Sequence, residues 1–138
     1  MMDLDHILEW WKANGGVFCD LAGVQEYAVV HRPPDAADRY PAPILMGSES
    51  LQAKTLGCTS PDVLIGDMAK RVPQYAEEGL RDYGAALRSW EPMMDVRRVQ
   101  GQLSCGLVDI RYARLLLPVR TTVGAKMVMT FSQPVSVH

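Results

Sequence analysis

Three residues near the first third of this 138-residue sequence have the chemistry of a general base and its orienting group. His31 is followed by a proline-rich stretch that carries Asp35 and Asp38, and a histidine held by a carboxylate can accept a proton from a substrate. A histidine at a strand end is commonly no more than solvated. We therefore expect a non-catalytic protein and keep a small α+β enzyme with His31 as general base as the alternative.

A second set of side chains could line a binding cavity. Arg114 interrupts an apolar stretch, so it either reaches solvent at a sheet edge or faces inward, where it needs an anionic partner such as a ligand carboxylate. Eight methionines are many for this length, and methionine adapts to irregular cavities as well as to ordinary cores. Tyrosine and tryptophan add a polar group to an apolar ring. The expected ligand-binding residues are Met46, Tyr83, Trp90, Met94, Tyr112, Arg114, Met127 and Met129, with ordinary core filling as the alternative for the methionines.

The composition disfavours several classes of protein. With 48% hydrophobic and 22% charged residues, the chain has the balance of one globular domain. The net charge of −2, with acids and bases interspersed, lacks the basic stripe of a nucleic-acid-binding protein and the polybasic patch of a membrane-surface protein. The apolar runs are too short to span a membrane, and the acidic start does not resemble a signal peptide.

The cysteines and acidic residues give no sign of a metal site. Cys19, Cys58 and Cys105 are scattered and form no CxxC pair, which disfavours a zinc knuckle or a disulfide framework and fits a reducing cytoplasm. The acidic residues show no metal-ligand spacing, and no glycine-rich phosphate loop occurs. We expect a cytoplasmic protein and assign no cofactor.

These side chains must be positioned by a chain that begins with an amphipathic helix. Residues 14–16 (Asn-Gly-Gly) end it, because glycine and asparagine tolerate the left-handed exit conformation. We divide the chain into this helix (1–16) and a domain (17–138). The helix either docks on its own domain or joins a dimer. Its apolar residues at helical spacing are Leu4, Ile7, Leu8 and Trp11.

The middle of the sequence predicts two short strands and a series of helices. Strands at 27–31 and 44–46 flank an irregular loop with four prolines, and short helical segments follow at 51–56 and 59–66. The longest helix covers 73–90, with one apolar face: Ala76, Leu80, Tyr83, Leu87 and Trp90. Its charged residues, Glu77, Glu78, Arg81, Asp82 and Arg88, are expected on the solvated faces, and Gly79 and Gly84 are expected at close packing against a sheet.

The last third predicts three strands, at about 94–100, 108–117 and 127–131. Val108, Ile110 and Tyr112 alternate with polar residues, so one face is buried and the other is wet. Residues 115–117 (Leu-Leu-Leu) break this alternation, which indicates burial on both faces or a bulge. Because no helix separates these strands, they should be antiparallel. The expected architecture is an α+β domain with a five-stranded antiparallel sheet and helices on one face.

Several of these stretches resemble a PAS domain, a sensory module of bacterial signalling. Residues 44–57 resemble its second strand and first helix, and 58–66 resemble the capped turn ending in Ile-Gly. Residues 73–90 match its long helix, and 112–119 resemble the Leu-Leu-Pro strand of short alphaproteobacterial PAS-like proteins. The similarity runs from Tyr27 to Gln133. The proline-rich loop departs from the tight hairpin that the family has between its first two strands.

The resemblance implies a sensor of a small apolar or amphipathic ligand, or of a partner protein. Such modules are usually homodimers, here through the opening helix and the sheet, without catalysis of their own. No kinase, cyclase or DNA-binding segment is present in the sequence, so a separate effector protein is expected. The haem ligand of the long helix is missing, which leaves only His31 for that role, and the flavin motif is absent after Cys58. A protein-interaction module with a fully packed core is a further alternative.

Overall fold

A computed structural model of the chain describes residues 3–17, 25–33, 43–51, 53, 68–103 and 106–135. The three cysteines, the segment at 59–66 and most of the helix at 51–56 lie outside these residues. Asp35 and Asp38, the carboxylates considered as partners of His31, lie outside them as well.

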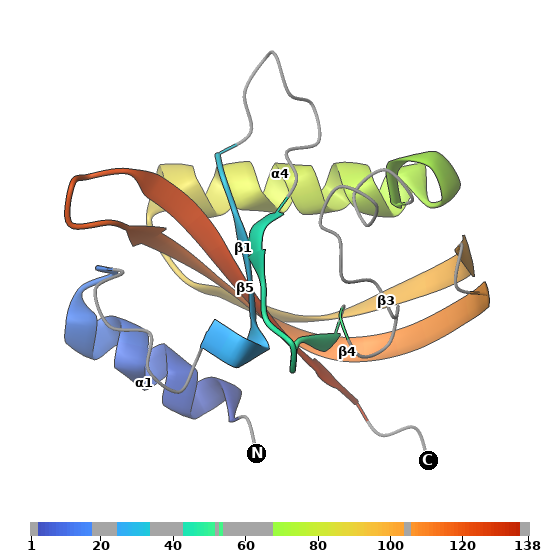
Figure 1. Ribbon diagram of the computed structural model, residues 1–138, viewed down its shortest axis with the longest axis horizontal. Coiled ribbons are helices and arrows are strands. Elements are labelled where there is room, and N and C mark those ends of the chain that lie inside the picture. The colour runs from blue at the N-terminus through green and yellow to red at the C-terminus, as the bar shows by residue number, and fades with distance from the viewer. Residues whose placement is uncertain are drawn as a thin grey trace.

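The elements follow the predicted order (Figure 1). They are α1 (Leu4–Asn14), the 3-10 turn η1 (Gln25–Tyr27), β1 (Ala28–His31), β2 (Pro43–Met46), α4 (Pro73–Ser89), β3 (Met93–Leu103), β4 (Gly106–Arg120) and β5 (Lys126–Pro134). The last three strands are longer than predicted, because β4 pairs with β3 from Met93 to Leu103 and with β5 from Lys126 to Pro134 without a break in register.

The five strands form one antiparallel sheet with the order β2-β1-β5-β4-β3. β5, the last strand in the chain, lies between β1 and β4, so the first and last parts of the domain pair in the centre of the sheet. The prediction of an α+β, PAS-like fold with a five-stranded antiparallel sheet is confirmed.

Local signals set the ends of both long helices. The Asp3 carboxylate accepts a hydrogen bond from the Asp5 N–H at 3.0 Å, and α1 ends at Gly15, whose φ of 63° is the left-handed conformation that glycine tolerates. α4 begins at Pro73. Proline fits the first turn of a helix because the N–H that it lacks would have no partner within the helix. It ends at Trp90, which has a φ of 54°.

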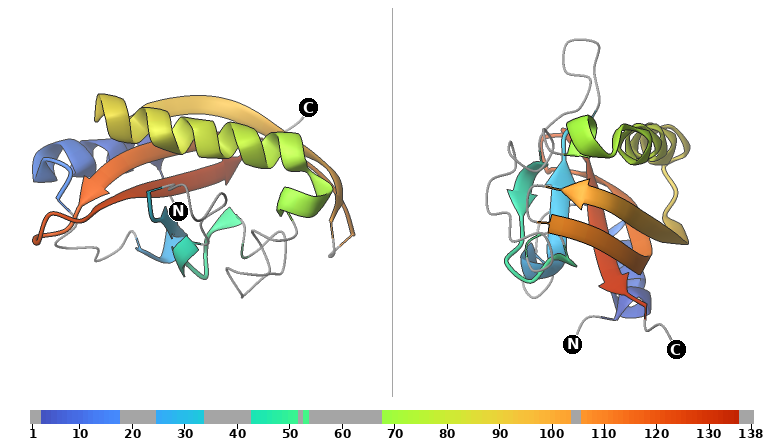
Figure 2. Two further views of the ribbon diagram at one scale, coloured as in Figure 1. Left: turned by 90° about the horizontal axis from the view of Figure 1, so that it is seen from above. Right: turned by 90° about the vertical axis from the view of Figure 1, so that its right-hand side faces the viewer.

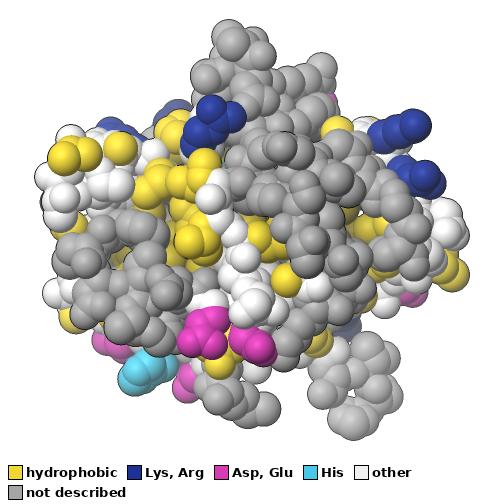
Figure 3. All heavy atoms as spheres, in the orientation of Figure 1, with side chains coloured by type: hydrophobic (Ala, Val, Ile, Leu, Met, Phe, Trp, Pro, Cys, Tyr) yellow, Lys and Arg dark blue, Asp and Glu magenta, His cyan; other side chains and the backbone are white. Residues whose placement is uncertain are grey.

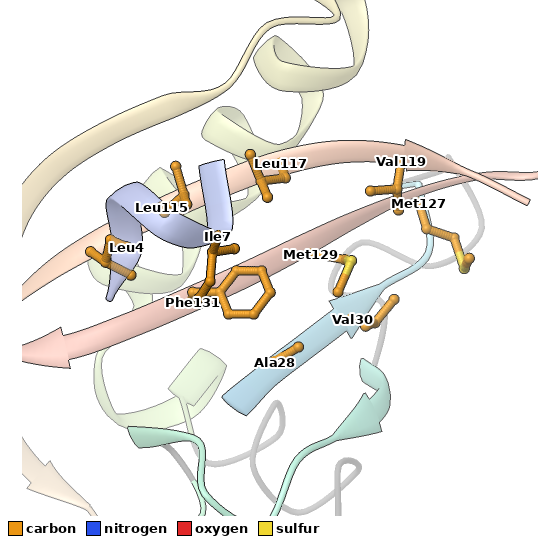
Figure 4. Packing of buried hydrophobic residues seen from close by; sticks show 10 residues of the cluster. All are labelled: Leu4, Ile7, Ala28, Val30, Leu115, Leu117, Val119, Met127, Met129 and Phe131. Atoms are coloured by element: carbon orange, nitrogen blue, oxygen red, sulfur yellow. The ribbon is translucent and has the colours of Figure 1, made fainter. Parts of the chain in front are cut away.

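α1 covers one face of the sheet, which we call the α1 face. Leu4 and Ile7 are buried against apolar residues of three strands (Figure 4). The Trp11 indole N–H donates to the Pro118 carbonyl at 2.7 Å, which fixes the helix to β4. The buried cluster on this face is entirely apolar: Leu4, Ile7, Ala28, Val30, Leu115, Leu117, Val119, Met127, Met129 and Phe131.

α4 lies across the opposite face, which we call the α4 face, so the sheet is sandwiched between two helices (Figure 2). This arrangement explains the Leu-Leu-Leu stretch of β4: Leu115 and Leu117 face α1, and Leu116 between them is also fully buried. The stretch pairs with β5 in continuous register, so burial on both faces, and not a bulge, breaks the alternation. No helix of the described residues is long and apolar enough to cross a membrane.

Candidate functional site

The α4 face holds a cavity of about 100 Å³ between α4 and the strands. An engineered apolar cavity of roughly 150 Å³ holds a benzene molecule, so this space is of the order of one small ring. Its lining combines aliphatic, aromatic and charged side chains from α4 and from β1, β3, β4 and β5, together with Leu51 and Met68: Val29, His31, Leu51, Met68, Tyr75, Ala76, Glu78, Gly79, Asp82, Tyr83, Arg97, Val99, Leu103, Ile110, Tyr112, Arg114, Thr130 and Ser132.

The face that α4 turns toward the cavity differs from the predicted one. Ala76 and Tyr83 line the cavity as expected, but Leu80 and Leu87 line a separate hollow beside Pro33. The helix is rotated because Glu78 and Asp82 turn toward arginines on β3 and β4. The prediction that these two carboxylates are simply solvated is therefore wrong.

Gly79 keeps part of the cavity open. A Cβ built at this position meets no neighbouring atom within 4 Å. Gly79 was predicted at close packing against the sheet, and instead it leaves space beside the sheet. A larger side chain here would therefore project into the cavity without forcing the backbone apart.

Arg114 faces inward and is buried, with only 6% of its surface exposed. Its Nε and Nη2 donate to the two carboxylate oxygens of Asp95 at 3.0 and 2.8 Å, and Nη2 also donates to Asp82 Oδ2 at 2.8 Å. The anionic partner that an inward Arg114 requires is thus supplied by the chain itself. The link to Asp82 ties α4 to β4, since these residues lie on different elements.

Arg97 extends this network on β3. Its Nη2 donates to Asp82 Oδ2 at 2.7 Å and its Nε donates to Asp95 Oδ2 at 3.2 Å, while Glu78 lies 3.7 Å from Nη1. We call Glu78, Asp82, Asp95, Arg97 and Arg114 the ionic cluster. It contains three carboxylates and two guanidinium groups, and each guanidinium has at least two carboxylate partners.

The ionic cluster shifts the pKa values of Asp95 and Arg114. Burial alone would raise the pKa of Asp95, but the hydrogen bonds and positive charge of Arg114 and Arg97 lower it below its ordinary value. Burial likewise opposes the charged form of Arg114, whereas Asp95 and Asp82 raise its pKa overall. Both groups therefore stay charged across the physiological range.

His31 and Tyr83 form an aromatic pair in the lining. Their rings lie 4.6 Å apart between centroids, with a tilt of 31°. Burial lowers the pKa of His31 to about 4 and raises the pKa of Tyr83, because both charged forms lose their hydration. Both side chains are therefore uncharged at neutral pH.

The lining also holds uncharged polar groups, on β1, β5, α4 and β4. His31 Nδ1, Thr130 Oγ1 and Ser132 Oγ are buried and have no hydrogen-bond partner in the described part of the chain. The Thr130 hydroxyl lies near enough to Tyr83 to affect its titration, yet it makes no hydrogen bond of normal geometry. The hydroxyls of Tyr75 and Tyr112, by contrast, hydrogen-bond to each other between α4 and β4.

The structure brings three of the eight predicted site residues into the cavity: Tyr83, Tyr112 and Arg114. Met127 and Met129 belong to the apolar cluster of the α1 face. The other three predicted residues also lie outside the cavity lining.

Met46 is half-buried opposite Val29 and is not among the lining residues, while Met94 is 48% exposed on β3. Trp90 caps α4, where Lys126 Nζ lies 5.7 Å from its ring centroid. None of the four methionines predicted at the site lines the cavity, and the lining takes its apolar surface mainly from valine, leucine and isoleucine, with Met68 as its one methionine among the described residues.

The sequence interpretation did not identify Ser132, Thr130 and Asp82 as site residues. The two hydroxyl residues carried a signal, because they alternate on a strand whose other residues are apolar. The helix sequence around Asp82 gave no such signal, because the role of Asp82 depends on arginines that lie 15 and 32 positions away.

The face of the molecule drawn in Figure 3 shows no broad basic area. In Figure 3 the Lys and Arg side chains lie in separate small areas, and acidic side chains gather at another edge. Among the described residues, no group of three His, Cys, Asp or Glu side chains could hold a metal ion.

Fold and cavity together define a PAS-like α+β domain with a candidate small-molecule site between its long helix and its sheet. Among solved structures, the chain is similar to VqmA of Vibrio cholerae, described as a dimeric LuxR-type receptor with a target DNA. The match has a TM-score of 0.52 and 13% identity, and it covers 99% of this chain and 52% of that one. The chain thus spans about half of VqmA, and at this identity the likeness concerns the fold.

No family model matches the sequence. No curated protein matches it either.

Proposed function

We propose that this chain is a non-catalytic sensory module, which binds a small molecule between α4 and the sheet and signals to a separate partner protein. The observation that carries the proposal is the cavity of about 100 Å³ on the α4 face, opposite a face that is filled by apolar side chains. A fully packed interaction module would have no such space. The fold likeness to a receptor supports the same class of function.

The ionic cluster gives a route from ligand to signal. Asp82 on α4 binds arginines on both β3 and β4, and all three side chains line the cavity. A ligand beside this link changes the preferred position of α4 relative to the sheet. Binding then shifts the population between two arrangements of the helix, which a partner protein can distinguish.

A cavity-filling variant tests the proposal. In Gly79→Leu the new side chain occupies the cavity, whereas in the matched control Gly79→Ala the added methyl group leaves most of it open. We expect a fragment library to contain molecules that raise the melting temperature of the wild-type chain and of Gly79→Ala, but not of Gly79→Leu. Native mass spectrometry of the three proteins then shows whether a bound molecule is lost only in Gly79→Leu.

Two results would contradict this proposal. If no library molecule stabilises the wild-type chain and none co-purifies with it, the cavity is not a binding site and the interaction-module alternative is favoured. If Gly79→Leu binds the same molecules as the wild type, the ligand binds elsewhere.

We further propose that two copies associate through α1 and the uncovered part of the sheet. Met94 and Val96 are 48% and 51% exposed, and they lie opposite Leu115 and Ala113, on the side of the sheet that α1 covers. Leu107, at 78% exposure, lies farther along β4, beyond the exposed Arg98–Asp109 pair. Such an exposed area beside a helix is typical of an interface.

Light scattering of Val96→Glu tests the association. We expect the dimer mass to fall to that of a monomer, while the control Val123→Glu, in the β4–β5 turn, keeps it. An unchanged mass for Val96→Glu would rule out this surface. Deletion of residues 1–13 is a less direct test, because it also removes Leu4 and Ile7 from the core.

The alternative of a small enzyme rests on His31, which lines the cavity. Its lowered pKa, about 4, makes it a weak base at neutral pH. His31→Gln separates the two functions: an enzyme that uses His31 as its base loses turnover, whereas a sensor keeps a ligand response that is weakened at most by the loss of one hydrogen bond. We also propose that the protein resides in the bacterial cytoplasm, on the basis of the resemblance. On the basis of the charge distribution, we propose that it does not itself bind nucleic acid. A gel-shift assay with random DNA checks the absence of nucleic-acid binding.

A further inference from the structure

Three buried polar side chains face the cavity without a hydrogen-bond partner among the described residues. His31, Thr130 and Ser132 are 6%, 5% and 4% exposed, and their Nδ1, Oγ1 and Oγ atoms are unpaired. Folded proteins satisfy nearly all of their buried polar groups, so each unpaired group requires an explanation. Three in one cavity point to a binding partner that supplies the missing hydrogen bonds.

The three side chains form a single group, which we call the polar row. Thr130 and Ser132 are two residues apart on β5, so both point to the same face of the sheet. His31 pairs with Val128 on the neighbouring strand, which places it diagonally across from Thr130 on that face. All three line the cavity. One small head group could therefore contact more than one of them.

The charged groups of the cavity are already matched with each other. Each guanidinium of Arg97 and Arg114 is bound by carboxylates of the ionic cluster. An anionic ligand would have to displace Asp82 or Asp95 from these arginines. A cationic ligand would lose its hydration and would have to compete with Arg97 and Arg114 for carboxylates that these arginines already bind. The site is therefore built for an uncharged molecule.

The rest of the lining limits the size and polarity of the ligand. Aliphatic side chains, among them Val29, Val99, Leu103 and Ile110, surround the cavity. Its volume of about 100 Å³ admits about one small ring or a short chain. The ligand must therefore have an apolar body as well as a polar head.

We infer that the ligand is a small uncharged amphipathic molecule, whose hydroxyl or amide head hydrogen-bonds to the polar row and whose apolar body packs on the aliphatic lining. The inference rests on the proposed sensory function and specifies the class of ligand. Serine and threonine hydroxyls both donate and accept, so they suit a head group that does the same.

Four probes of similar size separate the possibilities: benzamide, toluene, benzoate and benzylammonium. Binding of each to the full chain is measured by calorimetry at pH 7. We expect benzamide to bind at least about 10-fold more tightly than either ion. Ser132→Ala should weaken benzamide binding about 3- to 10-fold, as expected for one lost hydrogen bond, and leave toluene binding unchanged. The control Ser89→Ala, on the exposed end of α4, should leave the binding of both benzamide and toluene unchanged.

The other outcomes overturn the inference in different ways. Tighter binding of benzoate or benzylammonium shows that the site selects charge, and leaves the sensory function intact. Equal weakening of benzamide and toluene by Ser132→Ala shows a structural role for the hydroxyl instead of recognition. If none of the four probes binds, the class of ligand is wrong; the sensory function fails with it only if the Gly79→Leu comparison also reveals no ligand.

Discussion

The two faces of the sheet are built from the same strands and packed in opposite ways. Along β5, Met127, Met129 and Phe131 join an apolar cluster under α1. The residues between them, Thr130 and Ser132, line a cavity under α4 with unpaired hydroxyls. Because side chains alternate along a strand, one strand supplies both surfaces. The comparison indicates that the α1 face stabilises the fold, which allows the α4 face to keep space and unpaired polar groups for binding.

The largest effect separates two neighbouring residues on opposite faces. Phe131 is fully buried in the α1-face cluster, so Phe131→Ala should lower the free energy of unfolding by about 3–5 kcal/mol. Ser132→Ala should leave it unchanged or raise it, because the substitution removes a buried hydroxyl without a partner. Urea denaturation of both variants measures the difference. Similar losses for the two would contradict the division of roles between the faces.

A second effect is the acid sensitivity of the α4 face. The unfolded chain protonates His31 near pH 6.5, whereas the folded chain does so only near pH 4. The unfolded state therefore binds more protons between these values, and the free energy of unfolding falls by roughly 3 kcal/mol as the pH drops through this window. His31→Gln should remove this part of the pH dependence, and the control His6→Gln, on the exposed side of α1, should retain it. If the free energy of unfolding of His31→Gln depends on pH as strongly as that of the wild type, the imidazole is not held neutral by burial.

The third effect compares ion pairs on the two faces. Arg114→Met leaves buried carboxylates with only Arg97, and we expect a loss of about 2 kcal/mol in unfolding free energy. Arg98 and Asp109 form an exposed pair, with N–O distances of 2.8 Å, so Arg98→Met should leave the unfolding midpoint unchanged. If Arg98→Met destabilises the protein as much as Arg114→Met, burial does not distinguish the two pairs.

Much of this fold could be predicted from the sequence because its signals are local. Asp3 and Gly15 mark the ends of α1, Pro73 marks the start of α4, and alternation marks β4. The absence of a helix between the last three strands required antiparallel pairing, as the structure confirms.

The site was harder to predict, because it depends on which face of a strand turns toward which helix. When both faces of β5 are buried, alternation alone does not tell whether Met129 or Thr130 faces the cavity. The rotation of α4 could not be predicted from its own sequence either, because the partners of Asp82 lie on other elements. Arg114 was placed at a cavity because it interrupts an apolar stretch, and Tyr83 and Tyr112 were placed there because each adds a polar group to an apolar ring.

The smallest expected effect concerns two glycines on the cavity side. Gly79→Ala should raise the free energy of unfolding by up to about 1 kcal/mol, because the methyl group meets no neighbour and alanine favours the helix. Gly101→Ala should lower it, because its Cβ would lie 2.7 Å from Val72 Cγ1. Thermal denaturation compares the two. Destabilisation by Gly79→Ala would indicate that the space beside α4 is smaller than described.

The most direct test of the central claim is a methyl NMR titration of the full chain with benzamide. We expect shifts in the methyl groups of Val29, Val99 and Ile110, which line the cavity, and none in Leu117 and Val119 on the α1 face. Shifts confined to the α1 face would contradict a binding cavity between α4 and the sheet, and no shifts at saturating benzamide would contradict the inferred class of ligand.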